Sequence, residues 1–291
     1  MRRLVFITQH VDPGHPALAP TVRKVAALAA RVDELVVLAD GVVPSALPGN
    51  ARARSFRAAT KLGRGARFEA ALVQELKARP SAVVAHMCPI YAVLAAPLVR
   101  PLGIPLLLWF THWKPSRTLA LAERASTAVL TVDRRSFPLE SGKVVAIGHG
   151  IDLDNFPCTE RAPAERLRVV ALGRTSPAKG FETIVRAAAL ADVDLELRGP
   201  SLTAEERAER QRLETLGARV EEPIPYRDVP ALLERKDVLV NNMREGALDK
   251  VVYEAAATCM PVLASNSGFE DVLPGEYRFG RERDRREWHG S

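Results

Sequence analysis

Short apolar runs alternate with longer stretches of helical spacing along most of the chain, and this alternation constrains the fold more than any other feature. In the first half the apolar runs lie at residues 4–8, 35–39, 81–86, 104–110, 127–132 and 143–148. Helical patterns run through Val22, Val25 and Leu28 and through residues 67–78 and 90–100. Parallel strands need a long crossover, which is usually a helix, so the first half predicts a parallel sheet with helices on both faces.

The second half restarts the same pattern. Its apolar runs lie at residues 167–174, 193–199, 218–222 and 237–242, and its helical stretches at 175–190, 203–216 and 227–235. A chain of 291 residues is also longer than one ordinary core supports. We therefore predict an α/β protein with two Rossmann-like domains that face each other across a cleft. Their expected ranges are 1–157 and 158–291, with 149–157 as the turn and linker.

Polar side chains follow several of the predicted strands, where ligands of open α/β sheets bind. In the first half these residues are Gln9, His10, His86, Thr111, His112 and Asp133. A single histidine is more often structural than catalytic, but three at different strand ends strengthen the case for chemistry. The loop after the first strand contains no G-x-G-x-x-G, which argues against a dinucleotide-binding oxidoreductase.

Two cations follow the first predicted strand of the second half. Arg174 ends the strand and Lys179 opens the next helix, on a loop with Ser176, Pro177 and Gly180. Together with a helix N-terminus, the two cations would surround one diphosphate. An Arg and a Lys five residues apart are common, so the prediction depends on their place after this strand.

The segment 244–265, REGALDKVVYEAAATCMPVLAS, reads as a loop, a short helix and a buried strand. Between Lys250 and Thr258 almost every side chain is apolar or small, so we expect the helix to be buried nearly all round. Lys250 and Glu254 lie four apart and form its one charged stripe. We interpret this helix as the wall of a nucleotide-sugar cleft. An ordinary helix with one solvated edge explains the pattern equally well.

The two halves of the chain have opposite charge. Residues 1–150 carry 20 Lys and Arg against 9 Asp and Glu, and residues 151–291 carry 21 against 26. If residues 51–71 are helical, one basic stripe forms on the first half, and its members are Arg54, Arg57, Lys61 and Arg64. The stripe suggests an anionic membrane surface as a partner. Nucleic acid ranks lower because no binding motif accompanies the stripe, and a solvated basic face is the alternative.

Cysteine usage and hydropathy predict the compartment. Cys88, Cys158 and Cys259 are odd in number, far apart and without metal-ligand spacing, so we expect buried reduced thiols. No run of about 18 apolar residues occurs, and the N-terminus lacks a signal-peptide cleavage pattern. We expect a cytoplasmic protein, peripheral at the inner face of the membrane if the basic stripe docks there.

The motifs resemble those of the retaining glycosyltransferases of family 4, which have the GT-B fold. The resemblance covers nearly the whole chain and is carried by VAHMCPIYAVLAAPLVRPLGIPLLLWFTHW, VVAIGHGIDLDNF, ALGRTSPAKGFETIVRAA and VLVNNMREGALDKVVYEAAATCMPVLASNSGFEDVL. It is closest to a bacterial subgroup associated with polysaccharide and glycolipid assembly. Together these motifs are specific, although no single one would be.

The resemblance implies roles for particular residues. Arg174 and Lys179 match the residues that neutralise the departing diphosphate, Glu254 matches the residue that binds the ribose hydroxyls, and His112 would stabilise the reacting centre. The implied catalytic residues are His112, Arg174 and Lys179. The implied donor-binding residues are Gly173, Arg174, Lys179, Glu245, Gly246, Asp249, Lys250 and Glu254. The resemblance implies no cofactor beyond the nucleoside-diphosphate sugar, which is the donor substrate, and no D-x-D metal motif appears in the chain.

The chain departs from the family pattern at two places. Eight residues separate Glu245 from Glu254, one more than in the family motif, so Asp249 and Lys250 are expected to share the work at the sugar hydroxyls. The chain also stops after the charged tail 281–291, where the family continues with helices. We therefore expect a truncated end, a small second domain and impaired activity.

The sequence thus predicts a glycosyltransferase that moves a sugar from a nucleoside-diphosphate donor to an acceptor hydroxyl, with retention of configuration. The expected acceptor is a glycan or a lipid-linked molecule in cell-surface polysaccharide or glycolipid synthesis. Two alternatives stay open. One is a nucleotide-sugar epimerase of the same fold, and the other is a non-catalytic nucleotide-sugar binding protein.

Overall fold

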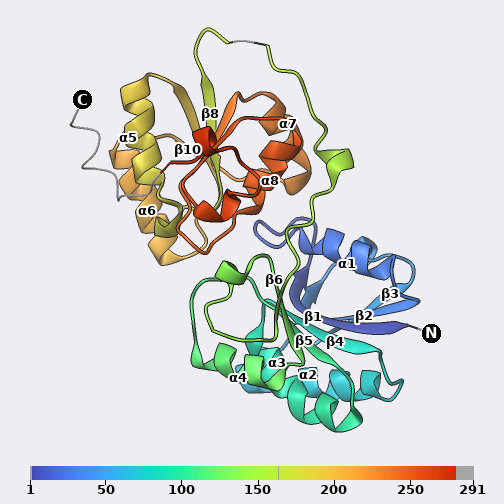
Figure 1. The fold of residues 1–291 in the computed structure, drawn as a ribbon. Coiled ribbons are helices and arrows are strands. Elements are labelled where there is room, and N and C mark those ends of the chain that lie inside the picture. Colours follow the sequence, from blue (N-terminus) through green and yellow to red (C-terminus); the bar gives the residue numbers. More distant parts are fainter. Residues whose placement is uncertain (1, 163, 280–291) are drawn as a thin grey trace. The chain divides into compact units, whose positions relative to one another are not determined.

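The computed structural model describes residues 2–162 and 164–279 and divides into two compact units (Figure 1). Unit 1 is Met1–Gly148 and unit 2 is His149–Ser291. Residues 149–157, the expected linker, belong to the second unit by their contacts. The charged tail 281–291, on which the expectation of a truncated end rests, lies outside the described residues.

The first unit contains a parallel sheet of seven strands in the order β3-β2-β1-β4-β5-β6-β7. The strands are β1 Arg3–Val11, β2 Glu34–Val42, β3 Ala51–Ser55, β4 Ala82–His86, β5 Leu106–Trp109, β6 Ala128–Thr131 and β7 Val144–Ala146. The helices are α1 Thr21–Ala29, α2 Lys61–Leu76, α3 Pro89–Val99 and α4 Arg117–Ala125. The predicted strands and helices of this half are confirmed, whereas β3 and α4 were not predicted from the sequence.

Both faces of the first sheet are covered by helices, as the alternation predicted. In β1, Val5 and Ile7 lie in a buried cluster with Phe68 of α2, and the neighbouring Phe6 lies in a second cluster with Val25 of α1. Successive side chains of a strand point to opposite faces, so these two clusters lie on opposite sides of the sheet. The strand therefore reads as a continuous apolar run because both of its faces are buried.

The predicted basic stripe does not form. Residues 51–55 are the strand β3, and only residues from Lys61 onward are helical. Arg54 pairs with Glu75, whose side chain is 1% exposed, at 2.6 Å. Arg64 lies 3.6 Å from Asp40. Buried carboxylates need cationic partners, and this need draws the arginines of β3 toward α2 instead of onto one helical face.

The second unit contains a five-stranded parallel sheet in the order β10-β9-β8-β11-β12. The strands are β8 Arg168–Leu172, β9 Asp194–Arg198, β10 Val220–Glu221, β11 Val238–Asn241 and β12 Val262–Ala264. The helices are α5 Phe181–Ala191, α6 Ala204–Thr215, α7 Val229–Glu234 and α8 Lys250–Ala257. All of these elements were predicted. Because β8 lies between β9 and β11, the strand order reverses beside it, and such a switch point is where α/β sheets bind ligands.

Helix α8 is buried as expected. None of its eight residues is exposed, and Glu254 is only 4% exposed. The charged stripe is therefore not a solvated helix edge. None of the helices in the described ranges has the length and apolar character needed to cross a bilayer.

The expectation of three reduced cysteines is wrong for two of them. Cys158 and Cys259 form a disulfide with their Cα atoms 4.9 Å apart. The two cysteines are 101 residues apart in sequence, so the pairing could not be predicted from their spacing. They meet because the segment before β8 runs past the C-terminus of α8. There Thr159 N donates to Thr258 O at 3.3 Å. Cys88 is a buried free thiol, as expected, and burial raises its pKa to about 11.

We expect one titratable thiol per unfolded chain without reductant, and three after reduction. Replacing Cys259 with serine should lower the free energy of unfolding by about 2–4 kcal/mol, because the cross-link closes a long loop in the unfolded chain. Thiol titration in denaturant and chemical denaturation measure the two effects. Cys88→Ala is the matched control and should leave no titratable thiol without reductant. Three thiols in the unreduced wild-type protein would contradict the pairing.

Candidate active site

The loops that follow β8 and β11 carry most of the predicted donor-binding residues. Residues 173–180 connect β8 to α5, and residues 242–249 connect β11 to α8. Both loops leave the carboxyl ends of adjacent parallel strands, since β8 pairs with β11. This edge of the second sheet is therefore the candidate site.

Gly173 and Gly199 allow the backbone to turn tightly at this edge. Gly173 has φ +137° and Gly199 has φ +157°, and a Cβ atom on Gly199 would collide with the carbonyl of Gly173. A Cβ atom on Gly173 would collide with the side chain of Lys179. The positive φ favours glycine at position 173, and the absent Cβ leaves room for the lysine side chain to fold back over the end of β8.

Lys179 is paired with Asp249 across the two loops. The lysine side chain is 11% exposed and also donates to Leu172 O at 3.3 Å. Asp249 Oδ2 accepts a second hydrogen bond, from Asn241 Nδ2 at 2.9 Å. Asp249 is the N-cap residue of α8, but its carboxylate makes no capping hydrogen bond to that helix. The carboxylate pairs with Lys179 instead. The ammonium of Lys179 is thus fixed between the carboxyl end of β8 and the start of α8.

Arg174 is held by a carboxylate that the sequence analysis did not identify. Its Nη1 lies 3.0 Å from Glu206 Oε1, and the Glu206 side chain is 5% exposed. The arginine side chain itself is 49% exposed. Arg174 and Lys179 therefore present two positioned cations on one loop.

Lys250 and Glu254 meet as their spacing predicted. Lys250 Nζ lies 2.7 Å from Glu254 Oε1. The hydroxyl of Tyr226 donates to the same oxygen, and Lys250 Nζ lies 4.7 Å from the centroid of the Tyr226 ring. A buried carboxylate with two donors is fixed in one orientation.

Glu245 is engaged away from the other predicted residues. Its Oε1 accepts from Ser267 N at 2.9 Å and its Oε2 accepts from Ser267 Oγ at 2.8 Å. Gly246 follows with φ +77°, a left-handed conformation that favours glycine. Glu245 thus joins the β11–α8 loop to the segment that follows β12.

In the first unit, His86 is committed to structure. It is 3% exposed, its Nδ1 lies 3.1 Å from Thr8 Oγ1, and its Nε2 lies 3.0 Å from Lys24 Nζ. Burial, followed by the charge of Lys24, lowers the pKa of His86 to about 3. The ring is therefore neutral, with Nε2 accepting from the ammonium and Nδ1–H donating to Thr8. The interpretation of His86 as a catalytic residue loses its support.

His112 follows β5 in the same unit and has a different arrangement. Its Nδ1 accepts from Lys114 N at 3.0 Å, and its ring stacks on Trp113 with a centroid distance of 5.2 Å. A neutral imidazole that accepts at Nδ1 carries its proton on Nε2. The ring proton of His112 therefore lies on Nε2.

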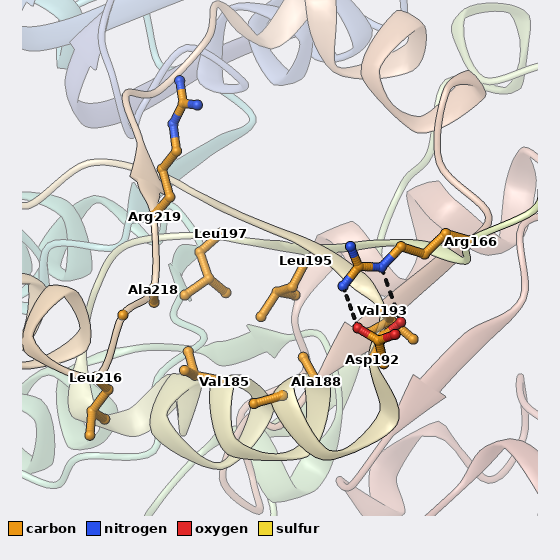
Figure 2. Close-up of a pocket in the computed structure, with 12 residues that line it drawn as sticks. Arg166, Val185, Ala188, Asp192, Val193, Leu195, Leu197, Leu216, Ala218 and Arg219 are labelled. Atoms are coloured by element: carbon orange, nitrogen blue, oxygen red, sulfur yellow. Dashed lines mark hydrogen bonds and ion pairs between the residues drawn. The ribbon is translucent and has the colours of Figure 1, made fainter.

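A hollow of about 270 Å³ lies elsewhere on the second unit (Figure 2). It is bounded by the C-terminal part of α5, by β9 and by residues 216–219, and the Arg166–Asp192 ion pair of 2.6 Å crosses one end. None of the predicted site residues lines it. Its lining includes the turn that leads into β9, whereas Arg174 and Lys179 follow the carboxyl end of β8.

One protein family matches more than half of the chain. The model of this family, described as family 4 glycosyltransferase in conflict systems, matches residues 121–288. The chain belongs to this family of glycosyltransferases. No curated protein matches the chain in sequence.

Solved structures share the fold of this glycosyltransferase. A sucrose-phosphate synthase from Thermosynechococcus elongatus is 18% identical with a TM-score of 0.76, and the match covers 96% of this chain and 85% of that one. HepE from Anabaena, solved in complex with UDP, is 19% identical with a TM-score of 0.71, covering 97% and 85%. A UDP-GlcNAc 2-epimerase from Methanocaldococcus jannaschii is 12% identical with a TM-score of 0.55, covering 97% and 89%. The predicted GT-B fold is confirmed.

Three residues that contact the predicted site residues of the glycosyltransferase were not predicted from the sequence. Glu206 had a visible signal, because Thr203-x-x-Glu206 is a capping-box pattern. Asn241 lies near the end of the predicted strand 237–242, at the edge where ligands bind, which was a weaker signal. Tyr226 begins a short 3₁₀ helix before α7, and its contact with Glu254 depends on the fold alone.

Proposed function

We propose that this glycosyltransferase takes its sugar from a nucleoside-diphosphate donor and transfers it to an acceptor hydroxyl with retention of configuration. The observation that carries the proposal is the pair of positioned cations on the β8–α5 loop. Arg174 is fixed by Glu206 and Lys179 by Asp249, and both residues lie on the loop that leads from β8 to α5. Positive charge beside a helix N-terminus is suited to a diphosphate.

The reaction requires stabilisation of charge on a leaving group. The bond between the anomeric carbon and the diphosphate oxygen breaks, and its electron pair stays with the diphosphate. The acceptor oxygen forms the new bond to the anomeric carbon, and its proton passes to the departing diphosphate. Arg174, Lys179 and the amide groups at the start of α5 would bind the diphosphate more strongly as its charge grows, and such interactions accelerate a reaction.

The remaining residues are proposed to position the donor. Glu254 would accept hydrogen bonds from the ribose hydroxyls, since its carboxylate is fixed by Lys250 and Tyr226. Asp249 and Lys250 would share the contacts to the sugar hydroxyls with Glu245. His112 would donate from Nε2 to the reacting centre.

The biological role and the acceptor stay predictions. The family description names conflict systems, and a role in polysaccharide or glycolipid synthesis with a glycan or lipid-linked acceptor is proposed from the sequence. An anionic membrane surface also stays a prediction. The basic stripe that suggested this partner does not form, because Arg54 belongs to β3 and pairs with Glu75.

Two other functions have distinct readouts. A nucleotide-sugar epimerase would convert the donor without any acceptor, and a non-catalytic protein would bind the donor without turnover. The likeness to the epimerase structure extends to the fold alone. Product analysis with the donor alone and with candidate acceptors distinguishes all three functions.

Replacing Glu254 with glutamine should weaken binding of the nucleoside diphosphate by about 1.5–3 kcal/mol and leave pyrophosphate binding unchanged. The reason is that the ribose, which pyrophosphate lacks, is the expected partner of this carboxylate. Calorimetric titration with both ligands measures the difference. Glu214→Gln is a matched control, because Glu214 is 46% exposed and pairs with Arg210 on α6. Equal losses for the two ligands would assign Glu254 a structural role.

A further inference from the structure

We infer that Glu206 is a positioning residue for Arg174, so that the capping box of α6 sets the geometry of the diphosphate site. The inference deepens the proposed function and rests on it. Glu206 lies in the first turn of α6, whereas Arg174 follows β8, and the ion pair between them joins that helix turn to the β8–α5 loop.

Each oxygen of the Glu206 carboxylate has its own task. Oε2 accepts from Leu202 N at 2.7 Å and from Thr203 N at 3.2 Å, which completes the capping box with Thr203 Oγ1. Oε1 faces Arg174 Nη1 at 3.0 Å. The backbone carbonyl of Glu206 also accepts from Thr175 Oγ1 at 2.9 Å, so the residue after Arg174 is tied to the same helix turn.

The two side chains of the ion pair differ strongly in burial. The Glu206 side chain is 5% exposed, and a buried carboxylate requires partners for both oxygens. Arg174 is 49% exposed, so its ion pair adds little stability by itself. The guanidinium has five N–H donors in a fixed plane, and fixing Nη1 on Glu206 orients the remaining donors. The pair is therefore better suited to orienting a ligand-binding arginine than to stabilising the fold.

The substitution Glu206→Gln separates the helix-capping contacts of Glu206 from its ion pair with Arg174. Glutamine is also a capping-box residue, so its single side-chain oxygen can continue to accept from Leu202 and Thr203. Its NH₂ group would then face Arg174, donor against donor, and the guanidinium would leave its position. Thr203→Ala is the converse variant, because it breaks the cap and keeps the carboxylate beside Arg174.

The test measures calorimetric affinity for ADP, CDP, GDP, TDP and UDP and then follows the tightest of these ligands in the variants. Glu206→Gln should weaken its binding roughly five- to tenfold, with little change in melting temperature. Thr203→Ala should lower the melting temperature and change affinity less than about twofold. In an Arg174→Ala background, Glu206→Gln should have no further effect on affinity, since it acts through the arginine.

The outcomes separate the inference from the function on which it rests. If Arg174→Ala binds the ligand as the wild-type protein does, or if none of the five diphosphates binds, the proposed donor site is overturned. If Arg174→Ala weakens binding but Glu206→Gln does not, the inference alone is overturned. If Thr203→Ala weakens binding as much as Glu206→Gln, Glu206 acts through the helix cap alone, and the positioning role is overturned.

Discussion

Replacing Lys179 with alanine is expected to weaken nucleoside-diphosphate binding by about 1.5–3 kcal/mol, or roughly 10- to 150-fold in Kd. The substitution removes a charge-assisted hydrogen bond donor from the proposed diphosphate site. It also leaves the carboxylate of Asp249 without its ion-pair partner, so the site gains repulsion toward the ligand. Calorimetric titration of the wild-type protein and the variant measures the loss.

Two further variants make this prediction specific. Asp249→Asn added to Lys179→Ala should recover part of the affinity, because it removes the repelling carboxylate. Arg186→Ala removes one positive charge from α5 at a side chain that is 61% exposed and paired with Glu182, and it should bind as the wild-type protein does. If Arg186→Ala and Lys179→Ala lose the same affinity, the effect comes from net charge alone and the specific role of Lys179 is contradicted.

Replacing His112 with alanine is expected to slow sugar transfer by about 100- to 1000-fold, the usual loss when one donor to a reacting centre is removed. Nucleoside-diphosphate binding should be unchanged, because the proposed nucleotide contacts belong to the second unit. Release of nucleoside diphosphate from the nucleotide sugar measures the rate, and calorimetry measures binding.

Asparagine at position 112 is the matched control for the local backbone. Its Oδ1 can replace Nδ1 as the acceptor for Lys114 N, but it supplies no group in place of the ring Nε2–H. His112→Asn should therefore be about as slow as His112→Ala. Recovery of the wild-type rate in His112→Asn would mean that His112 only holds its own loop.

The sheets were predictable because their inner strands are buried on both faces. Runs such as residues 4–7 and 35–39 are continuously apolar, and the helices between them have clear apolar spacing. The edge strand β3 escaped prediction because its sequence, ARARS, alternates alanine with arginine and contains no apolar run. Its arginines pair with Glu34 and Glu75, which are distant in sequence.

The candidate site was predictable where it depends on local sequence. The spacing of Lys250 and Glu254 placed both side chains on one face of a helix, and the structure brings them to 2.7 Å. The partners of Arg174 and Lys179 come from segments that are distant in sequence, so Glu206 and Asp249 could be assigned to them only from the fold. The Cys158–Cys259 disulfide escaped for the same reason.

The most direct measurement is a thermal-shift screen of nucleoside diphosphates and their sugars against the wild-type protein and the Arg174→Ala/Lys179→Ala double variant. A ligand that binds only the folded protein raises its melting temperature by mass action. The account predicts that at least one nucleotide or nucleotide sugar raises the melting temperature of the wild-type protein and leaves that of the double variant unchanged. No shift with any ligand, or the same shift in both proteins, would contradict a donor diphosphate held by these two cations.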